Sequence, residues 1–370
     1  MGERWRSAVP SLLSVVLALG VCWVAIALTR DAEVAGEAYL QMLYGGLGQW
    51  PRFLETGDVG TLTRPLGEAA IKAAILLLTG LSVAVAFKAG LFNIGAQGQM
   101  LLGALMAALA GAHLSLPSVL HVPVALLAAA VAGAAWALIA AALKLMRGVH
   151  EVISTIMLNW VAVSLVDNWL AVGPLRAAVS GGHSISGTAE ILPSAQLPRM
   201  LGDLSRLNLG FVLALLIALL VWVGLFRTRR GFEIRAAGLG ADAARTAGIA
   251  VKQRTAEAMG LAGALAGLAG ALLVLGTEFR YPGSLGAPYG FDGIAIALIG
   301  NSHPVGVTLS ALFFGILRAG GTRMQLLGVH KSFPELIQGL ALLFVAGRLV
   351  WLSLLRKRRA VSASTEVPRA

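Results

Sequence analysis

Long apolar runs recur along the chain, and they restrict the folds that it can adopt. A helix needs roughly 20 apolar residues to cross the hydrocarbon core of a bilayer. Inside that core every backbone polar group must be hydrogen-bonded within the protein, so such runs become helices. Only 13% of the residues are charged, against roughly 25% in soluble proteins. We therefore predict an all-α integral membrane protein with about ten transmembrane helices, at residues 8–28, 66–88, 94–112, 122–143, 151–171, 208–226, 256–275, 291–302, 304–321 and 334–352.

The distribution of basic residues predicts how these helices are oriented. Basic residues concentrate in the cytoplasmic loops of membrane proteins. Here they gather between the sixth and seventh spans, after the fourth span (Lys144 and Arg147) and after the last (Arg356–Arg359). These segments fall on the same side as the N-terminus, so both termini are predicted to be cytoplasmic. Arg323 and Lys331 fall on the external side and run against the rule.

The net charge of +11 is explained by these loops. No basic cluster is interleaved with aromatic residues that could stack on bases, so a nucleic-acid partner is not expected. The single cysteine, Cys22, lies in the first apolar run, which excludes an intrachain disulfide.

Two stretches share a pattern of glycine, polar residue and glycine followed by a small-residue apolar helix. They are "GLFNIGAQGQMLLGALMAALAG" (90–111) and "YGFDGIAIALIGNSHPVGVTLSALFFGIL" (289–317). Since they follow spans of opposite direction, they suggest an inverted repeat, although chance resemblance between Gly/Ala/Leu-rich segments remains an alternative. The predicted organisation is an N-terminal anchor helix and external loop (1–65), a membrane core (66–355) and a cytoplasmic tail (356–370). Within the core, the repeats at 66–171 and 256–352 are joined by span 208–226 and a cytoplasmic loop at 227–255.

The chain lacks the usual sequence motifs of catalysis. It has no H-E-x-x-H, C-x-x-C, G-x-S-x-G or G-x-x-x-x-G-K-[ST] pattern, and its histidines lie far apart in sequence. We predict neither an enzyme nor a metal or cofactor site. If ATP drives this protein, a different subunit must bind the ATP.

The cytoplasmic segment Arg227–Gln253 is the most informative polar stretch. Its glycines delimit a short alanine-rich helix at about 241–247, too short to be stable alone in water. The segment is therefore either an ordinary basic loop or a docking helix for a soluble partner. In the second interpretation the helix residues are Ala241, Asp242, Ala243, Ala244, Arg245 and Gly248.

Polar residues inside apolar segments are the candidates for a substrate pathway: Asn93, Gln97, Gln99, Asn159, Trp160, Asp292 and Asn301. Buried amides can hydrogen-bond a polar solute and cost less to bury than carboxylates. Other roles remain open, because the amides can cap a helix start, Trp160 can face lipid, and Asp292 can lie at the external edge. By contrast, Gly260, Gly263, Gly267 and Gly270 form a helical stripe that predicts close packing of helices.

Four segments together resemble a known family. They are "GLFNIGAQGQMLLGA", "GVHEVISTIMLNW", "RRGFEIRAAGLGADAARTAGI" and "GFDGIAIALIGNSHPVG", in order between residues 65 and 350. They resemble permease subunits of bacterial ABC importers in the branched-chain amino acid/ribose-type superfamily, and within it the nucleoside branch. That family commonly has glutamate where this chain has Gln97, which leaves the substrate preference open.

The resemblance implies a multi-pass permease of the inner (cytoplasmic) membrane. Its partners would be cytoplasmic ATPase subunits, a second identical or homologous permease and an external substrate-binding lipoprotein. The substrate would be a nucleoside-like solute, and Ala241–Gly248 would be the coupling helix that fits a groove on the ATPase. A sugar permease of the ribose type and a stand-alone ion-coupled transporter are the alternatives.

Overall fold

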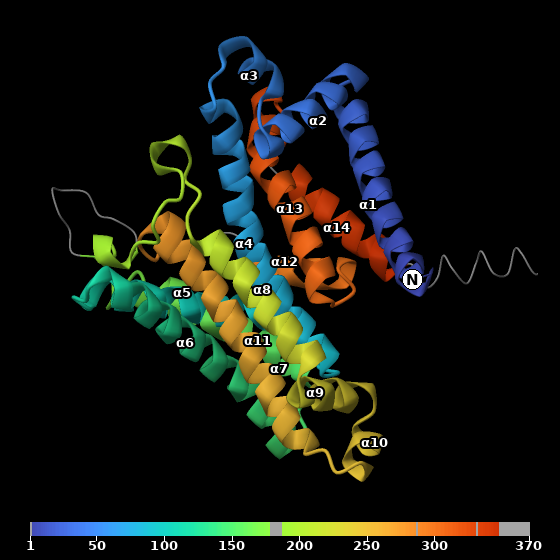
Figure 1. Cartoon of the computed structure of the whole chain (residues 1–370), viewed down its shortest axis with the longest axis vertical. Coiled ribbons are helices and arrows are strands. Elements are labelled where there is room, and N and C mark those ends of the chain that lie inside the picture. Colours follow the sequence, from blue (N-terminus) through green and yellow to red (C-terminus); the bar gives the residue numbers. More distant parts are fainter. Residues whose placement is uncertain (1, 178–186, 286–287, 331, 348–370) are drawn as a thin grey trace, which may run out of the picture.

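The protein is a bundle of helices of very different lengths (Figure 1). The computed structural model describes residues 2–177, 187–285, 288–330 and 332–347. The α-helices in this part of the chain are α1 (Gly2–Thr29), α2 (Ala32–Leu47), α3 (Trp50–Thr56), α4 (Gly60–Lys88), α5 (Ala96–His113), α6 (Ser118–Arg147), α7 (Glu151–Leu165), α8 (Gly210–Arg227), α9 (Arg229–Leu239), α10 (Ala241–Thr246), α11 (Val251–Leu273), α12 (Tyr289–Ile299), α13 (Pro304–Met324) and α14 (Phe333–Ala346). Two π-helical segments, Val166–Leu170 and Val274–Glu278, extend α7 and α11. The described residues contain no β-strand, so the predicted all-α class is confirmed.

Membrane-length helices are present at six of the ten predicted spans. Six helical stretches are long and apolar enough to cross a bilayer: Gly60–Lys88, Ser118–Arg147, Glu151–Leu170, Gly210–Arg227, Val251–Glu278 and Pro304–Leu327. Shorter apolar helices cover Leu13–Thr29, Tyr289–Ile299 and Phe333–Val345, and α5 occupies the remaining predicted span. The end of the last predicted span and the tail at 356–370 lie outside the described residues.

The segment 29–65, expected as a loop, is largely helical. Asp31 caps α2 by accepting a hydrogen bond from the backbone N–H of Val34 (2.7 Å). One face of α2 carries small residues and packs against α13, and a Cβ at Gly45 would lie 2.8 Å from the Cα of Gly320. Helix α2 gains its stability from this tertiary contact. The mixed composition of residues 32–47 therefore did not predict a helix.

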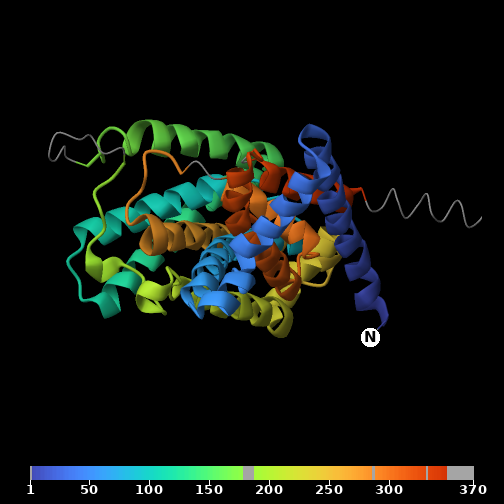
Figure 2. The ribbon, with the colours of Figure 1, turned by 90° about the horizontal axis from the view of Figure 1, so that it is seen from above.

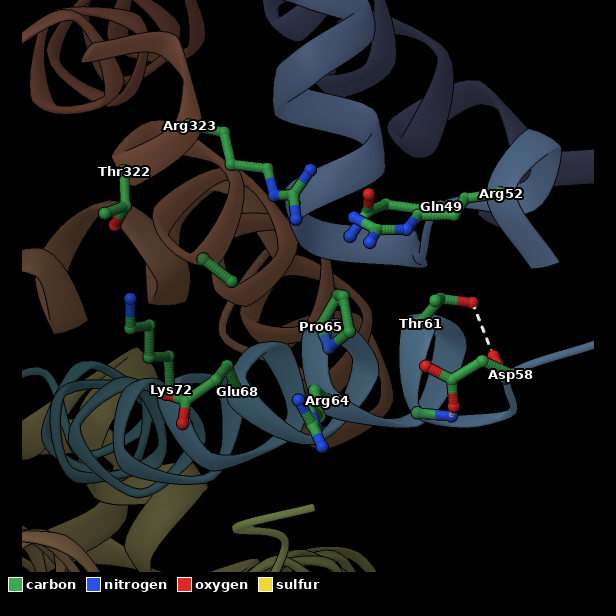
Figure 3. Close-up of a pocket in the computed structure, with 13 residues that line it drawn as sticks. Gln49, Arg52, Asp58, Thr61, Arg64, Pro65, Glu68, Lys72, Thr322 and Arg323 are labelled. Atoms are coloured by element: carbon green, nitrogen blue, oxygen red, sulfur yellow. Dashed lines mark hydrogen bonds between the residues drawn. The ribbon is translucent and has the colours of Figure 1, made fainter. Parts of the chain in front are cut away.

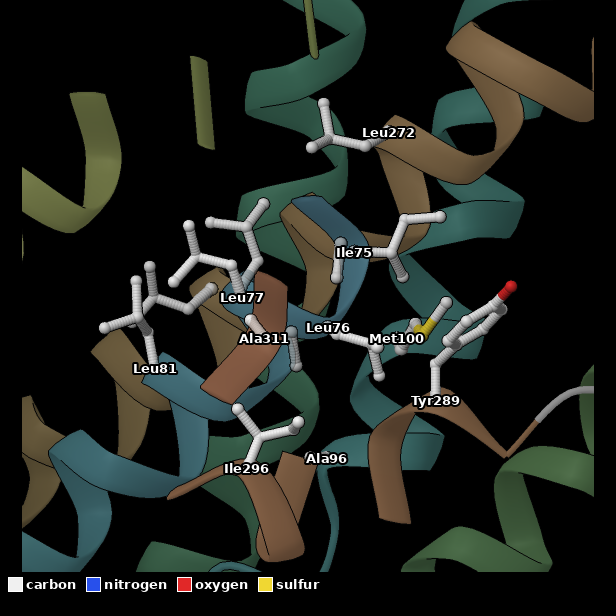
Figure 4. Close-up of a cluster of buried hydrophobic side chains, with 14 of the residues drawn as sticks. Ile75, Leu76, Leu77, Leu81, Ala96, Met100, Leu272, Tyr289, Ile296 and Ala311 are labelled. Carbon is white, nitrogen blue, oxygen red and sulfur yellow. The ribbon is translucent and has the colours of Figure 1, made fainter. Parts of the chain in front are cut away.

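Helices α4 and α11 form the centre of the bundle. The most apolar 18-residue windows of α4 and α11 are 83% and 78% buried, whereas those of α6 and α8 are 33% and 28% buried. Around α4 the core is filled by Met100 of α5, Leu272 of α11, Ile296 of α12 and Ala311 of α13 (Figure 4). The outer helices therefore keep apolar faces free for lipid or for other subunits.

The glycine stripe on α11 is a packing seam, as predicted. A Cβ at Gly263 would lie 2.3 Å from the carbonyl oxygen of Gly133 in α6, and one at Gly270 would lie 2.3 Å from that of Met100 in α5. Only glycine permits such close approach of helix backbones. Gly260 is the exception, since a Cβ there would meet nothing closer than Leu138 at 3.5 Å.

This contrast yields a matched test of the seam. Gly267→Val should lower the yield of monodisperse protein sharply, because its Cβ would lie 2.2 Å from the carbonyl oxygen of Ala129, and overpacking of this kind costs about 1–3 kcal/mol or more. Gly260→Val, on the same helix, should behave like the unmodified protein. Size-exclusion chromatography of the two variants in detergent checks this, and equal losses would contradict the packing role.

The connections between helices gather at two opposite ends of the bundle. At one end, below α4 in Figure 1, α9 and α10 lie beside the α4–α5 connection, where a Cβ at Gly238 would meet the carbonyl oxygen of Lys88 at 2.3 Å. At the same end the rings of Phe226 and His303 lie 4.9 Å apart. At the other end are α2, α3 and the 187–209 segment, which is tied to α5 by the hydrogen bond from Leu192 N to Gly111 O (2.8 Å). We call these the α10 end and the α3 end.

Candidate functional site

Helices α5 and α12 begin at the same buried point of the bundle. Gly90, with φ +72°, ends the α4 turn, and the chain runs without helix to Gly95 before α5 starts. The side chain of Gln97 in the first turn of α5 accepts a hydrogen bond from the backbone N–H of Gly290 in α12 (2.7 Å). A Cβ at Gly290 would lie 2.3 Å from the Cα of Gln97, so glycine is required for this approach. The two helix N-termini, each a source of positive potential, thus converge.

The buried amides predicted to line a pathway hold this junction together. The side chains of Asn93 and Gln99 exchange two hydrogen bonds of 2.9 Å each, and Asn93 also accepts from the N–H of Gly95 (3.1 Å). Asn159 of α7 accepts from the N–H of Gly98 (2.8 Å) and donates to the carbonyl of Ile94 (2.7 Å). Asn93, Gln97 and Asn159 each accept a hydrogen bond from a backbone N–H at a helix start, so the capping alternative describes their contacts.

A cleft opens beside this junction, between α7, the start of α5 and the start of α12. Its volume is about 220 Å³, and it is lined by Gln97, Asn159, Trp160, Val163, Asp167, Ser284, Pro288 and Phe291. Trp160 is 67% exposed and Phe291 is 43% exposed, so two aromatic faces are available at its opening. Because α7 lies at the edge of the bundle (Figure 2), the cleft is open to the surroundings rather than enclosed by this chain.

Three of the predicted pathway residues therefore meet at the cleft: Gln97, Asn159 and Trp160. Asn93 and Gln99 lie behind them, fully buried in the amide pair. The structure does not bring Asp292 or Asn301 to the cleft, since neither lines it.

Asp292 and Asn301 have other surroundings. The carboxylate of Asp292 forms an ion pair of 2.8 Å with Arg318 of α13, and that guanidinium lies 4.4 Å above the ring of Tyr289. Asn301 lies in the tight turn between α12 and α13 with φ +53°, a conformation that asparagine adopts more readily than most residues. Both residues fix how α12 joins α13.

Asp167 is a cleft residue that sequence reasoning did not select. It lies in the π-helical segment that extends α7 and accepts hydrogen bonds from the hydroxyl groups of Tyr281 and Ser284. Burial, followed by the contact with Asp167, raises the pKa of Tyr281 far above its usual range, so this phenol remains a donor. An acid within an apolar span is a known signal of function, but the sequence did not show that Asp167 faces the same space as Trp160.

The short helix α10 is present as predicted and is almost completely exposed. Asp242 and Arg245 form an ion pair of 3.0 Å on its surface, with side-chain exposures of 95% and 66%. Only Ala244 is buried, and Gly248, with φ +80°, ends the helix. The neighbouring Leu239 is 91% exposed. A short exposed helix beside an exposed leucine is suited to docking on a partner.

Helix α9 precedes α10 and is held to the bundle by contacts with three other segments. Glu233 of α9 pairs with Arg254 at the start of α11 (2.9 Å), and Arg235 donates to the carbonyl of Leu225 at the end of α8 (2.9 Å). At its far end, Gly238 packs directly on the backbone of Lys88–Gly90. The segment 91–97, which follows this contact along the chain, contains Asn93 and Gln97. Helix α9 therefore contacts the segment that leads into the cleft.

These features define a class of protein: an all-helical membrane protein, with a polar and aromatic cleft at a helix junction and an exposed helix at one end. In the described residues no group of three His, Cys, Asp or Glu side chains is arranged to hold a metal ion.

Comparison with known proteins agrees with this class. The family described as "Branched-chain amino acid transport system / permease component" matches residues 66–346. The chain belongs to this family. No solved structure matches it.

Several curated relatives cover most of its length. The guanosine ABC transporter permease protein NupP of Bacillus subtilis is 39% identical over 76% of this chain and 80% of its own length. The glucose ABC transporter permease protein TsgB13 of Haloferax volcanii is 36% identical over 78% of each chain. The nucleoside ABC transporter permease protein NupB of Lactococcus lactis subsp. cremoris is 32% identical over 81% of this chain and 84% of its own length.

Proposed function

We propose that this chain is the permease subunit of an ATP-driven importer and forms the path of a nucleoside-like solute through the inner membrane. The observation that carries the substrate class is the cleft, in which Trp160 and Phe291 border the polar groups of Gln97, Asn159 and Asp167. A nucleobase can stack on an aromatic face, while hydroxyl and amide groups pair with its edge and ribose. The relatives from Bacillus and Lactococcus are named for guanosine and nucleoside transport and support the same substrate class.

The cleft is proposed to be one half of the substrate path. Its volume of about 220 Å³ is below the roughly 300–1,000 Å³ usual for small-molecule sites, and it opens at the edge of the bundle. A second permease, identical or homologous, would complete it. Gln97, Asn159 and Trp160 are proposed to contact the solute, with Asp167 and Phe291 added, whereas Asn93, Gln99, Asp292 and Asn301 support the helices around it.

The α10 end is proposed to be cytoplasmic. This assignment follows from the basic residues between α8 and α11, and it places both termini in the cytoplasm with about ten crossings. Helices α4 and α11 run in opposite directions and each precedes a helix that starts at the shared junction, which supports the inverted repeat. Residues Ala241–Gly248 would then dock on a cytoplasmic ATPase, and an external binding lipoprotein would deliver the solute at the α3 end.

Uptake measurements test the substrate and the energy source. Cells that express the complete transporter should accumulate labelled guanosine or another nucleoside in preference to ribose and glucose. A preference for glucose would support the sugar alternative, which the Haloferax relative represents. Accumulation by the chain alone in vesicles, driven only by a proton or sodium gradient, would support an ion-coupled transporter. That alternative normally relies on carboxylates within the membrane, and the two candidates here are both engaged: Asp292 is paired with Arg318, and Asp167 accepts hydrogen bonds from Tyr281 and Ser284.

The stacking role of Trp160 has a matched control on the same helical segment. Trp160→Ala should raise the KM for nucleoside uptake about fivefold or more, because stacking of a base contributes about 1–3 kcal/mol. Trp160→Phe should retain most of the affinity. Trp169, which is 59% exposed and does not line the cleft, should tolerate replacement by alanine. If Trp169→Ala raises KM as much as Trp160→Ala, the effect comes from packing of the exposed face and the assignment is wrong.

A further inference from the structure

A second and larger pocket lies at the α3 end, away from the cleft (Figure 3). Its volume is about 490 Å³, and its walls are α2, α3, α4 and α13. It shares no lining residue with the cleft. Nothing in the proposed transport path uses it.

The walls of this pocket are built by specific contacts. Pro65 has no N–H, so it leaves the carbonyl of Thr61 without its helical partner. That carbonyl instead accepts from the backbone N–H of Gln49 (3.1 Å), which ties the α2–α3 connection to α4. On the other side a Cβ at Gly45 would lie 3.0 Å from Cδ of Arg323, so glycine lets the arginine stem lie against α2. The pocket is thus a built feature of the fold.

Four basic side chains line the pocket: Arg52, Arg64, Lys72 and Arg323. In Figure 3, Arg52 and Arg323 extend toward each other from α3 and α13. The guanidinium groups of Arg52, Arg64 and Arg323 have no hydrogen-bond or ion-pair partner among the described residues. Within the described part of the chain, Lys72 donates to the backbone carbonyl of Arg318 (3.2 Å).

The two acidic residues of the pocket are already engaged. Asp58 accepts from the N–H of Gly60 (2.8 Å), and Glu68 pairs with Arg206 from the 187–209 segment (3.5 Å). The pocket therefore presents several arginines with unmet hydrogen-bonding capacity. Guanidinium groups match the planar, doubly accepting geometry of phosphate and carboxylate.

The position of the pocket indicates the source of this anion. Helix α3 exposes Trp50 (55%) and Leu54 (81%), and Val59 beside it is 50% exposed. Tryptophan is enriched where the membrane meets water, and no residue of α3 is buried within this chain. Arg52 lies on α3 itself and Arg64 lies near the start of α4, so basic groups of the pocket are close in sequence to these exposed apolar residues.

An apolar cavity of about 380 Å³ adjoins the same two long helices. It is lined by Leu66 and Ala70 of α4 and by Leu312 and Ile316 of α13, within about one to two helical turns of the basic pocket. This cavity lies on the side of α4 that faces Phe211 of α8, and it shares no lining residue with the basic pocket.

We propose that the pocket formed by Arg52, Arg64, Lys72 and Arg323 binds the phosphate headgroup of an anionic phospholipid of the outer leaflet. The bound headgroup neutralises the arginines and joins α3, α4 and α13. This site is separate from the substrate path and does not depend on which solute is carried.

Lipid titration of the purified full-length chain tests the proposal. Native mass spectrometry should show that phosphatidylglycerol binds about fivefold or more tightly than zwitterionic phosphatidylcholine, equivalent to about 1 kcal/mol. Arg64→Gln combined with Arg323→Gln should abolish this preference. Arg199→Gln is the matched control, since Arg199 is exposed at the same end and does not line the pocket. If the double variant is not monodisperse, Arg52→Gln alone should reduce the preference.

Several results would overturn the proposal. Equal binding of the two lipids, or an equal loss in Arg199→Gln, would mean that the pocket does not select the headgroup. Equal binding of soluble glycerophosphoglycerol or inorganic phosphate would identify a site for a free anion. Retained phosphatidylglycerol selectivity in the double variant, together with weaker docking of the external binding protein, would identify a protein-docking surface.

Discussion

Asp242→Arg combined with Arg245→Glu is expected to reduce ATP-driven uptake to near background while the protein still inserts and folds. The exchange preserves the 3.0 Å ion pair within α10 but reverses the charge pattern that α10 presents to its partner. If the free energy of docking becomes about 1.4 kcal/mol less favourable, the association constant between α10 and its partner falls about tenfold. The measurements are nucleoside uptake and substrate-stimulated ATP hydrolysis by the reconstituted complex, which should become uncoupled from each other.

Two further variants separate docking from helix stability. Exchanging the charges also opposes the helix dipole, at about 0.3–1 kcal/mol for each residue, so α10 itself is weakened. Ala243→Trp keeps the ion pair and adds bulk at an exposed position of α10, and it should uncouple as well. Lys252→Glu reverses an exposed charge on the first turn of α11 and should leave uptake nearly unchanged. Normal uptake in both α10 variants would contradict the docking role.

Gln97→Leu is expected to lower uptake about fivefold or more, because the backbone N–H of Gly290 loses its acceptor and a buried unpaired donor costs about 1–3 kcal/mol. The N-termini of α5 and α12 would separate, and the cleft between them would change shape. Uptake by whole cells and the thermal stability of the purified chain should both be measured, since the first reports the path and the second the junction.

Gln97→Glu is the informative companion to this variant. Glutamate keeps an oxygen for the Gly290 N–H, lies at two helix N-termini that favour negative charge, and is the residue that the family resemblance leads one to expect. It should restore the stability lost in Gln97→Leu. A change of nucleoside preference in Gln97→Glu at normal stability would assign substrate contact to this position. Unchanged uptake in Gln97→Leu would mean that neither the cap nor the contact matters for transport.

The membrane core and the short helix could be predicted because both depend on local sequence. Long apolar runs can cross a bilayer only as helices or closed barrels, and Gly240 and Gly248 mark where the short helix α10 begins and ends. The stripe on α11 was also predictable, because Gly263, Gly267 and Gly270 recur at helical spacing. Helices α2 and α3 were missed, since what stabilises them is contact with α13 and α4 rather than their own composition.

The roles of the polar residues could not be predicted in the same way. Gln97 and Gly290 are 193 residues apart, and Asp167 and Tyr281 are 114 apart. An amide at a helix start has the same sequence pattern whether it caps its own helix, caps a distant helix or binds a substrate. The pairing of Asp292 with Arg318 likewise joins α12 and α13 through two residues that the sequence alone did not bring together.

The amino-acid sequence by itself determined that this protein is a helical membrane protein, because hydrophobic length and helix-breaking glycines act over one or two turns, and its four motifs in order resembled a permease family. Only the tertiary structure decided which polar side chains face open space. Trp160, Asp167 and Phe291 share a cleft, and Arg52, Arg64 and Arg323 share a pocket, because helices distant in sequence pack side by side. The contacts between those helices, rather than any local pattern, place these groups together.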